Sequence, residues 1–362
     1  MNTAKNAKSQ IDAHQFSDFA ACVREDCAVW LEGMRCPGKP MGYYRFNAHS
    51  YHPWALYAAI GAFAVLRALG RIEQLTAQER QEWADLYLST YHQPSGRFLC
   101  PQLYGTTFKG DPNNPDDLVA ADRAAPLKKV GFDLLELGAA IPPMSDEGTL
   151  GYAGIADLEQ FFDEEVRRRD PYSYGSVLGG FAHERTLWLL SQNRSLDGDP
   201  WIEWYYEYVE KRRDPETGLM TGASENRMLQ MDGLFKGLYS MLKRHGRPMP
   251  HARKVIDSIL DIQHPEGGFG EVCEDYNATK LLCGLCIQEQ KYRSEDVLQA
   301  VTGPVLQRLQ SRRRKDGGFS MHTTHCLTHV NSIPISDPLP ESDVTGTEQQ
   351  LAVLNEIQSL LQ

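Results

Sequence analysis

Acidic side chains stand at or near the start of several apolar segments of this sequence. Glu274 and Asp275 precede one such segment, Asp343 precedes the last, and Asp232 interrupts another. Carboxyl groups held at the edge of an apolar region are suited to general acid–base catalysis. We therefore predict all four as catalytic candidates, with the alternative that Asp275 and Asp343 serve only as helix N-caps, a position that Asp favours.

Three histidines extend this set of catalytic candidates. His49 and His52 lie three residues apart before Pro53, and His183 lies with Glu184 inside an apolar run. Histidine changes its charge near neutral pH, so each could transfer a proton. A hydrogen-bonded pair of His183 and Glu184 in the core is the alternative.

Aromatic and polar residues near the same segments predict a binding surface. Aromatic rings stack on sugars and stabilise cations. The predicted substrate-binding residues are Tyr44, Tyr51, Trp54, Arg123, Tyr174, Arg227, Tyr276 and Asn277.

Metal chemistry has a weaker signal. His322, His325 and His329 are closely spaced, but residues three apart in an extended segment point to opposite faces, so chelation needs a turn. We predict no cofactor and no metal, with these histidines as the alternative ligands. The sequence contains no nucleophile elbow, P-loop or dinucleotide fingerprint.

These residues must be positioned by alternating helices. Six apolar segments predict inner helices at 51–70, 127–140, 173–191, 227–243, 275–290 and 343–361. Six amphipathic segments predict outer helices at 16–34, 76–91, 154–168, 199–212, 249–263 and 293–311. Similar Gly-containing turns recur with a period of about 45–50 residues, which is typical of a helical repeat.

Closing the repeats into a ring would bury both end faces. We predict an all-α fold, an (α/α)6 toroid, as a single domain over residues 16–362 after a flexible N-terminus at 1–15. Residues 101–150 carry an Asp-, Asn- and Pro-rich stretch that predicts an irregular loop insertion.

The Gly-Gly-Phe turns resemble those of the terpene cyclase and prenyltransferase toroid superfamily, including the squalene-cyclase type. Repeats of that superfamily end in Gln, a short spacer, Gly and an aromatic residue. Gln263 precedes the turn at 267–269, and Gln310 precedes the turn at 317–319. The resemblance covers about 110 C-terminal residues well and implies the toroid fold.

The catalytic motifs of that superfamily are absent. Its protonating cyclases carry Asp-x-Asp-Asp, with the middle Asp as the acid, and here the matching position is Asn277 after Asp275 and Tyr276. The zinc ligands of the protein prenyltransferases and an Asp-Asp-x-x-Asp magnesium motif are also missing.

Composition limits the partners. The net charge is −11, and no basic stripe offsets it, which argues against a nucleic-acid partner. The N-terminus resembles no secretory signal, and no apolar run is long enough to span a bilayer, so we expect a cytoplasmic protein. We predict a small-molecule substrate and make no prediction of oligomeric state.

Three functions remain open at this point. The first is an enzyme that acts by carboxylate acid–base chemistry on an isoprenoid or polycyclic molecule, as the resemblance implies. The second is a carbohydrate-active hydrolase or lyase, because paired carboxylates and aromatic platforms suit that chemistry. The third is a non-catalytic binding protein on the same fold, which Asn277 favours.

Overall fold

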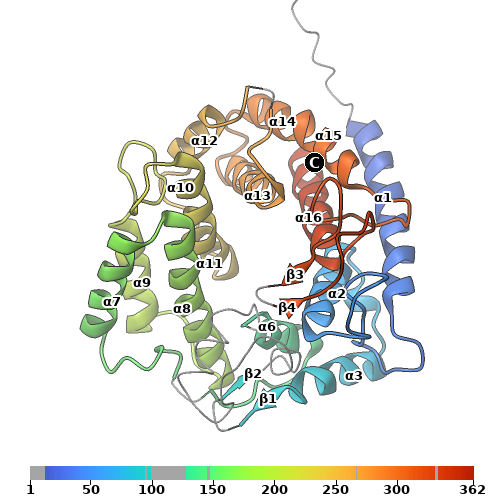
Figure 1. Cartoon of the computed structure of the whole chain (residues 1–362). Helices are drawn as coiled ribbons and strands as arrows, with labels where there is room; N and C mark the ends of the chain where they lie inside the picture. Colours follow the sequence, from blue (N-terminus) through green and yellow to red (C-terminus); the bar gives the residue numbers. More distant parts are fainter. Residues whose placement is uncertain (1–12, 94–95, 99–127, 145–146, 266, 331–332) are drawn as a thin grey trace, which may run out of the picture.

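The computed structural model describes residues 13–93, 96–98, 128–144, 147–265, 267–330 and 333–362, and these ranges are mainly helical. The strands within them form two short antiparallel hairpins. β1 (Tyr91–His92) pairs with β2 (Arg97–Phe98), and β3 (His329–Val330) pairs with β4 (Ile333–Pro334). The helices lie in two layers around one axis (Figure 1), as expected for the predicted α/α toroid.

Among the described residues, the inner layer contains six helical segments, each overlapping the range predicted for it. None of the helices in the described ranges is long and apolar enough to cross a bilayer. The inner segments are α2 (Leu56–Ala68), α6 (Lys128–Leu137), α8 (Pro171–Ser191), α10 (Arg227–Leu234) continued by the π-helical turn η2 (Phe235–Tyr239) and α11 (Ser240–Arg244), α13 (Val272–Gln288), and α16 (Val344–Leu361).

The outer layer also follows the prediction, with one difference. The helix expected at 293–311 is divided between Thr302 and Pro304, because proline has no backbone N–H to donate and begins a new helix instead. The outer helices are α1 (Ala13–Met34), α3 (Ala77–Leu88), α7 (Ile155–Arg168), α9 (Pro200–Glu210), α12 (Ala252–Asp261), α14 (Ser294–Thr302) and α15 (Pro304–Arg312), with a short 3-10 helix η1 (Ile72–Gln74) before α3.

The ring closes where its last inner helix meets its first. α16 packs against α13 on one side and against α2 on the other. Around the rest of the ring, α2 contacts α6, α6 contacts α8, α8 contacts α10, and α10 contacts α13. A linear array of helix pairs would leave two end faces exposed, and the contact of α16 with α2 buries both.

Glycines let two inner helices approach closely. A Cβ atom on Gly175 of α8 would lie 2.5 Å from the carbonyl oxygen of Gly233 on α10. A Cβ atom on Gly179 would clash with the carbonyl oxygen of Lys236 in η2. These positions therefore require glycine for packing, and they fix α10 and η2 against α8.

The two Gly-Gly-Phe turns are built alike and lead toward inner helices. Gly267 and Gly317 have φ angles of 92° and 104°, which glycine adopts without strain. Phe269 and Phe319, which follow these turns, are fully buried. The repeated turn predicted from the sequence therefore anchors its aromatic residue in the core.

Candidate active site

Asp343, predicted as an acid, is engaged as a helix cap. Its Oδ1 accepts a hydrogen bond from the backbone N–H of Gly346 at 2.7 Å. Its Oδ2 accepts hydrogen bonds from the N–H groups of Met321 and Leu327 at 2.8 and 2.9 Å. Burial raises the pKa of the Asp343 carboxyl group, and these backbone donors act to lower it. The contacts hold residues 321–327 on the start of α16 and account for an aspartate here without a catalytic role.

Asp275, near the start of α13, also accepts a hydrogen bond from the backbone of the preceding segment, as Asp343 does. The backbone N–H of Phe269 donates to Oδ1 of Asp275 at 2.7 Å, and the guanidinium group of Arg312 lies 3.9 Å from Oδ2. The Asp275 residue is only 3% exposed. Its contacts hold the preceding Gly-Gly-Phe turn against the helix.

Asp232 has a different environment from these two clamping acids. It lies on α10 and is 1% exposed. The side-chain amide of Asn277 on α13 donates to Oδ1 of Asp232 at 2.8 Å. Its Oδ2 has no hydrogen-bond partner among the described residues. One oxygen is therefore held in place by Asn277, while the other has no such bond in the described structure.

The protonation of Asp232 suits proton transfer. Burial raises the pKa of Asp232 to about 6, the hydrogen bond from Asn277 acts to lower it, and the negative charge of Glu274 raises it. Lys236 also acts to lower the pKa of Asp232. Both protonation states are therefore populated near neutral pH, as general acid–base catalysis requires.

Two further buried oxygens belong to the same region. Oε2 of Glu274 on α13 and Oε1 of Gln349 on α16 have no hydrogen-bond partner among the described residues. The Nε2 of Gln349 donates to Sγ of Cys273 at 3.9 Å, and the charges of Glu274 and Asp232 both act on that thiol. We call Asp232 Oδ2, Glu274 Oε2 and Gln349 Oε1 the acceptor cluster. It draws on α10, α13 and α16.

Aromatic rings and lysines lie on α13 and on the neighbouring segments η2 and α8. Tyr276 follows Glu274 by two residues, and its ring lies edge to face with Phe235 at a centroid distance of 5.8 Å. The Nζ of Lys280 lies 4.9 Å from the Tyr276 ring centroid, and the Nζ of Lys236 lies 3.5 Å from that of Tyr172. The rings of Tyr276 and Tyr172 are thus each in contact with a lysine ammonium group.

The predicted histidines make other contacts. The Nδ1 of His183 lies 2.7 Å from the carbonyl oxygen of Gly179, and its ring meets Phe132 of α6 edge to face at 5.6 Å. The Nδ1 of His49 lies 2.7 Å from Oε2 of Glu341, and the carbonyl oxygen of His52 accepts from the Ser50 hydroxyl. His183 therefore lies where α6 meets α8, and His49 contacts the segment before α16.

Most of the predicted binding residues also have partners away from the acceptor cluster. Tyr44 is buried and stacks on Trp83 at 5.4 Å, and Tyr174 is buried beside Phe162 at 6.3 Å. Asn277 contacts the acceptor cluster directly. Among the other predicted binding residues, the Tyr51 hydroxyl donates to Asp337 at 2.7 Å and Trp54 packs on Tyr43. Arg227 begins α10, and Arg123 lies outside the described residues.

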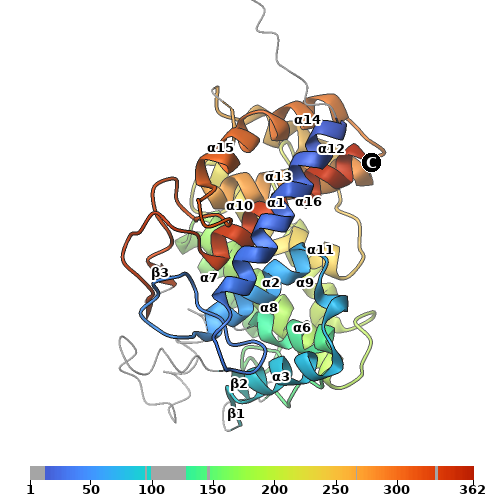
Figure 2. The same cartoon turned by 90° about the vertical axis from the view of Figure 1, so that its right-hand side faces the viewer.

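The alternative metal ligands gain no support. The rings of His322 and His325 stack at 4.7 Å, and His329 begins β3, at one end of the ring (Figure 2). Burial lowers the pKa of His322, as does its neighbour His325. Within the described ranges, no three or more His, Cys, Asp or Glu side chains form a group that could hold a metal ion.

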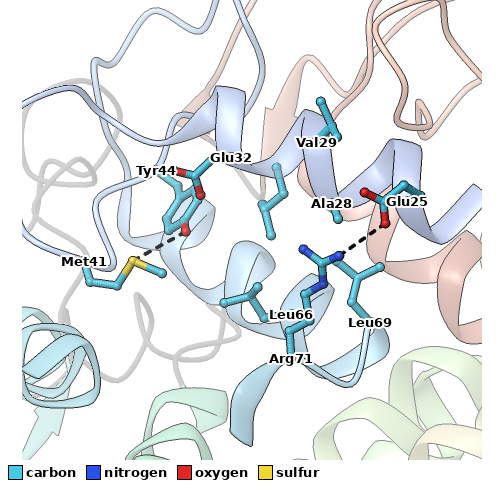
Figure 3. Close-up of a pocket in the computed structure, with 10 residues that line it drawn as sticks. Glu25, Ala28, Val29, Glu32, Met41, Tyr44, Leu66, Leu69 and Arg71 are labelled. Carbon is cyan, nitrogen blue, oxygen red and sulfur yellow. Dashed lines mark hydrogen bonds and ion pairs between the residues drawn. The ribbon is translucent and has the colours of Figure 1, made fainter. Parts of the chain in front are cut away.

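A pocket opens beside the outer helix α1, as Figure 3 shows. Its volume is about 230 Å³. The Tyr44 hydroxyl donates to Sδ of Met41 at 3.7 Å in this pocket, and Arg71 pairs with Glu25 at 3.5 Å. Its lining residues come from α1, residues 41–44 and the segment 66–71, and they include none of the acids of the acceptor cluster.

Comparison with known proteins adds little beyond this geometry. No family model matches the chain, and no curated protein matches it by sequence. Among solved structures it is similar to a variant of the type II terpene cyclase MstE from Scytonema in complex with geranylgeranyl dihydroxybenzoate. The TM-score is 0.42 at 12% identity, over 96% of this chain and 98% of that one. A likeness this distant carries no weight for the function.

Sequence reasoning did not select Gln349 or Lys236. Gln349 lies in the polar run Thr347-Glu348-Gln349-Gln350 near the start of α16, so it does not stand out as Asp232 does. Lys236 follows Asp232 by four residues, but the π-helical turn that carries it has no sequence signature that we recognised. Of this cluster, a polar interruption of an inner helix therefore indicated Asp232, and a position before an apolar segment indicated Glu274.

Proposed function

We propose that this chain is an enzyme that uses Asp232 for general acid–base chemistry on an isoprenoid or polycyclic small molecule at the ring axis. The observation that carries the proposal is the state of this carboxyl group. It is buried, one oxygen is held by Asn277, the other has no hydrogen-bond partner in the described structure, and its pKa is raised to about 6. Raised acid pKa values are typical of functional sites.

The roles of the neighbouring residues follow from their contacts. Oδ2 of Asp232 would give a proton to an electron-rich double bond, and the Asn277 amide would keep the carboxyl group oriented. The faces of Tyr276 and Phe235 would stabilise the cation formed. The final cation would lose a proton to a carboxylate, so that the reaction is an isomerisation and consumes no other reactant.

The relation of Asp232 to Asn277 explains the missing superfamily motif under this proposal. Asn277 stands where a protonating cyclase carries its acid. The carboxyl group comes instead from Asp232 on the neighbouring helix, 45 residues earlier, and it bonds to Asn277 directly. The two helices would thus have exchanged the acid and the residue that orients it.

A product screen tests this function. The purified protein would be incubated with linear isoprenoids of increasing length and with polycyclic analogues, and the products analysed by mass spectrometry. We expect an isomerised product whose formation falls by about 100-fold or more in Asp232→Asn. The matched control is Glu295→Gln, which alters an exposed carboxylate on outer helix α14. Full turnover by a folded Asp232→Asn protein would refute the proposal.

A second candidate is a carbohydrate-active hydrolase or lyase. Two carboxyl groups, Asp232 and Glu274, act on each other electrostatically, and such pairs perform glycoside hydrolysis. The same screen with oligosaccharides separates the two functions. A carbohydrate enzyme should lose activity equally in Asp232→Asn and Glu274→Gln, because both carboxyl groups react. Ligand binding without any product would instead favour a non-catalytic protein.

A further inference from the structure

The three oxygens of the acceptor cluster have no hydrogen-bond donor among the described residues. Glu274 Oε2 and Gln349 Oε1 are buried acceptor atoms without a partner in the described structure, as is Asp232 Oδ2. A buried acceptor left unpaired costs about 1–3 kcal/mol, and more when it is charged. Three such atoms from three inner helices are therefore an arrangement that a ligand or water would stabilise.

Three donor groups of this region make other contacts. The Asn277 amide donates to Oδ1 of Asp232, and the Gln349 amide donates to Sγ of Cys273. The Lys236 ammonium group lies on the ring of Tyr172, at 3.5 Å from its centroid. None of these contacts supplies a proton to the free oxygens of Glu274 and Gln349.

The chemistry of these oxygens indicates which ligand group fits. A carboxylate and an amide oxygen both accept hydrogen bonds, and Oε2 of Glu274 and Oε1 of Gln349 are both buried. Aromatic rings attract cations, and Phe235 and Tyr276 lie edge to face here, with the Lys280 ammonium group already on Tyr276. A protonated amine satisfies all three demands, because it carries positive charge and at least one N–H donor.

We infer that the acceptor cluster binds a protonated amine on the ligand, with Glu274 Oε2 and Gln349 Oε1 as its acceptors. This inference rests on the proposed function for the location of the substrate, and it narrows that substrate to an amine-bearing molecule. Asp232 Oδ2 then remains available for proton transfer.

Binding of the amine would also affect the acid. The negative charge of Glu274 raises the pKa of Asp232. An ammonium group beside Glu274 offsets that charge, so it lowers the pKa of Asp232 and reduces the fraction of Asp232 that is protonated at a given pH.

A matched pair of ligands tests the amine site without any need for turnover. Geranylamine and geraniol share one isoprenoid chain and differ in the charged donor group. By calorimetry we expect geranylamine to bind about tenfold or more tightly than geraniol, as a hydrogen bond to a charged group implies. We expect Glu274→Gln and Gln349→Met to reduce that preference to about threefold or less, and Glu295→Gln to leave it unchanged.

The possible outcomes are distinct. Equal affinity for the two ligands, no measurable binding of either, or an intact preference in a folded Glu274→Gln protein would each overturn the inference. If water molecules donated hydrogen bonds to the acceptor cluster instead, the two ligands would bind with equal affinity. Tighter binding of geranylamine than of geraniol without any turnover would refute only the proposed catalysis. Turnover without that difference in affinity would refute only the amine site.

Discussion

Asp232 is a buried acid whose charged form is costly to the folded state. The ordinary pKa of an aspartate is 3.8, and burial raises that of Asp232 to about 6. The folded state therefore holds this proton to a higher pH than the unfolded state does. For such a group, the free energy of unfolding decreases as the pH rises from about 4 to about 6 and is level above that range.

The first prediction concerns Asp232→Asn. This change can keep the hydrogen bond from Asn277 and removes the buried charge. We expect the variant to exceed the wild type in unfolding free energy by about 1–3 kcal/mol near pH 7.5, and by almost nothing near pH 4. Urea unfolding at both pH values measures the difference. A variant less stable than the wild type near pH 7.5 would show that burial of the charge is not costly here.

The second prediction concerns Asp343, where the same substitution should act in the opposite direction. An asparagine side chain would turn an NH2 group toward some of the N–H donors of Gly346, Met321 and Leu327. We expect Asp343→Asn to lose about 2–4 kcal/mol of unfolding free energy. The matched control is Asp337→Asn, an exposed residue of the same loop, which should change stability by less than about 1 kcal/mol. A fully stable Asp343→Asn protein without activity would restore Asp343 as the catalytic acid.

At the scale of elements, the contact between α8 and the segment α10–η2 depends on missing side chains. We expect Gly179→Ala to lose about 2–3 kcal/mol of unfolding free energy or more, because its Cβ would displace the backbone at Lys236. The control is Gly33→Ala on α1, where no heavy atom lies within 4 Å of the added Cβ. Alanine should stabilise that exposed helical site by about 0.5–1 kcal/mol. Similar effects at both sites in denaturant titrations would refute this account of the packing.

The elements themselves were largely predictable. Apolar composition identified the inner helices, and amphipathic spacing identified their outer partners, because both signals lie within single segments. The division between α14 and α15 was missed, although Pro304 was a visible signal. The start of α2 at Leu56 instead of residue 51 was also missed, since residues 51–54 form bends. The predicted loop insertion at 101–150 falls mostly outside the described residues.

At the scale of the whole molecule, closure makes the first and last repeats neighbours. A chain that ends at Ser342 would lack α16 and expose the packed faces of both α13 and α2. We expect that truncated chain to lose its cooperative unfolding transition, whereas a linear repeat array would lose only one unit. The full chain should unfold in one calorimetric transition, as the predicted single domain requires. A cooperative transition retained after truncation would contradict both expectations.

The sequence by itself determined the alternation of inner and outer helices, the repeated turns and the list of candidate acids, because composition and spacing are local properties. It did not distinguish Asp232 from Asp275 and Asp343. Only the tertiary structure decided this, because their partners come from other elements. Backbone N–H groups clamp Asp275 and Asp343, whereas Asp232 meets one amide from a helix 45 residues away. The environment of a carboxyl group is set by what folds around it, and that is a property of the closed ring.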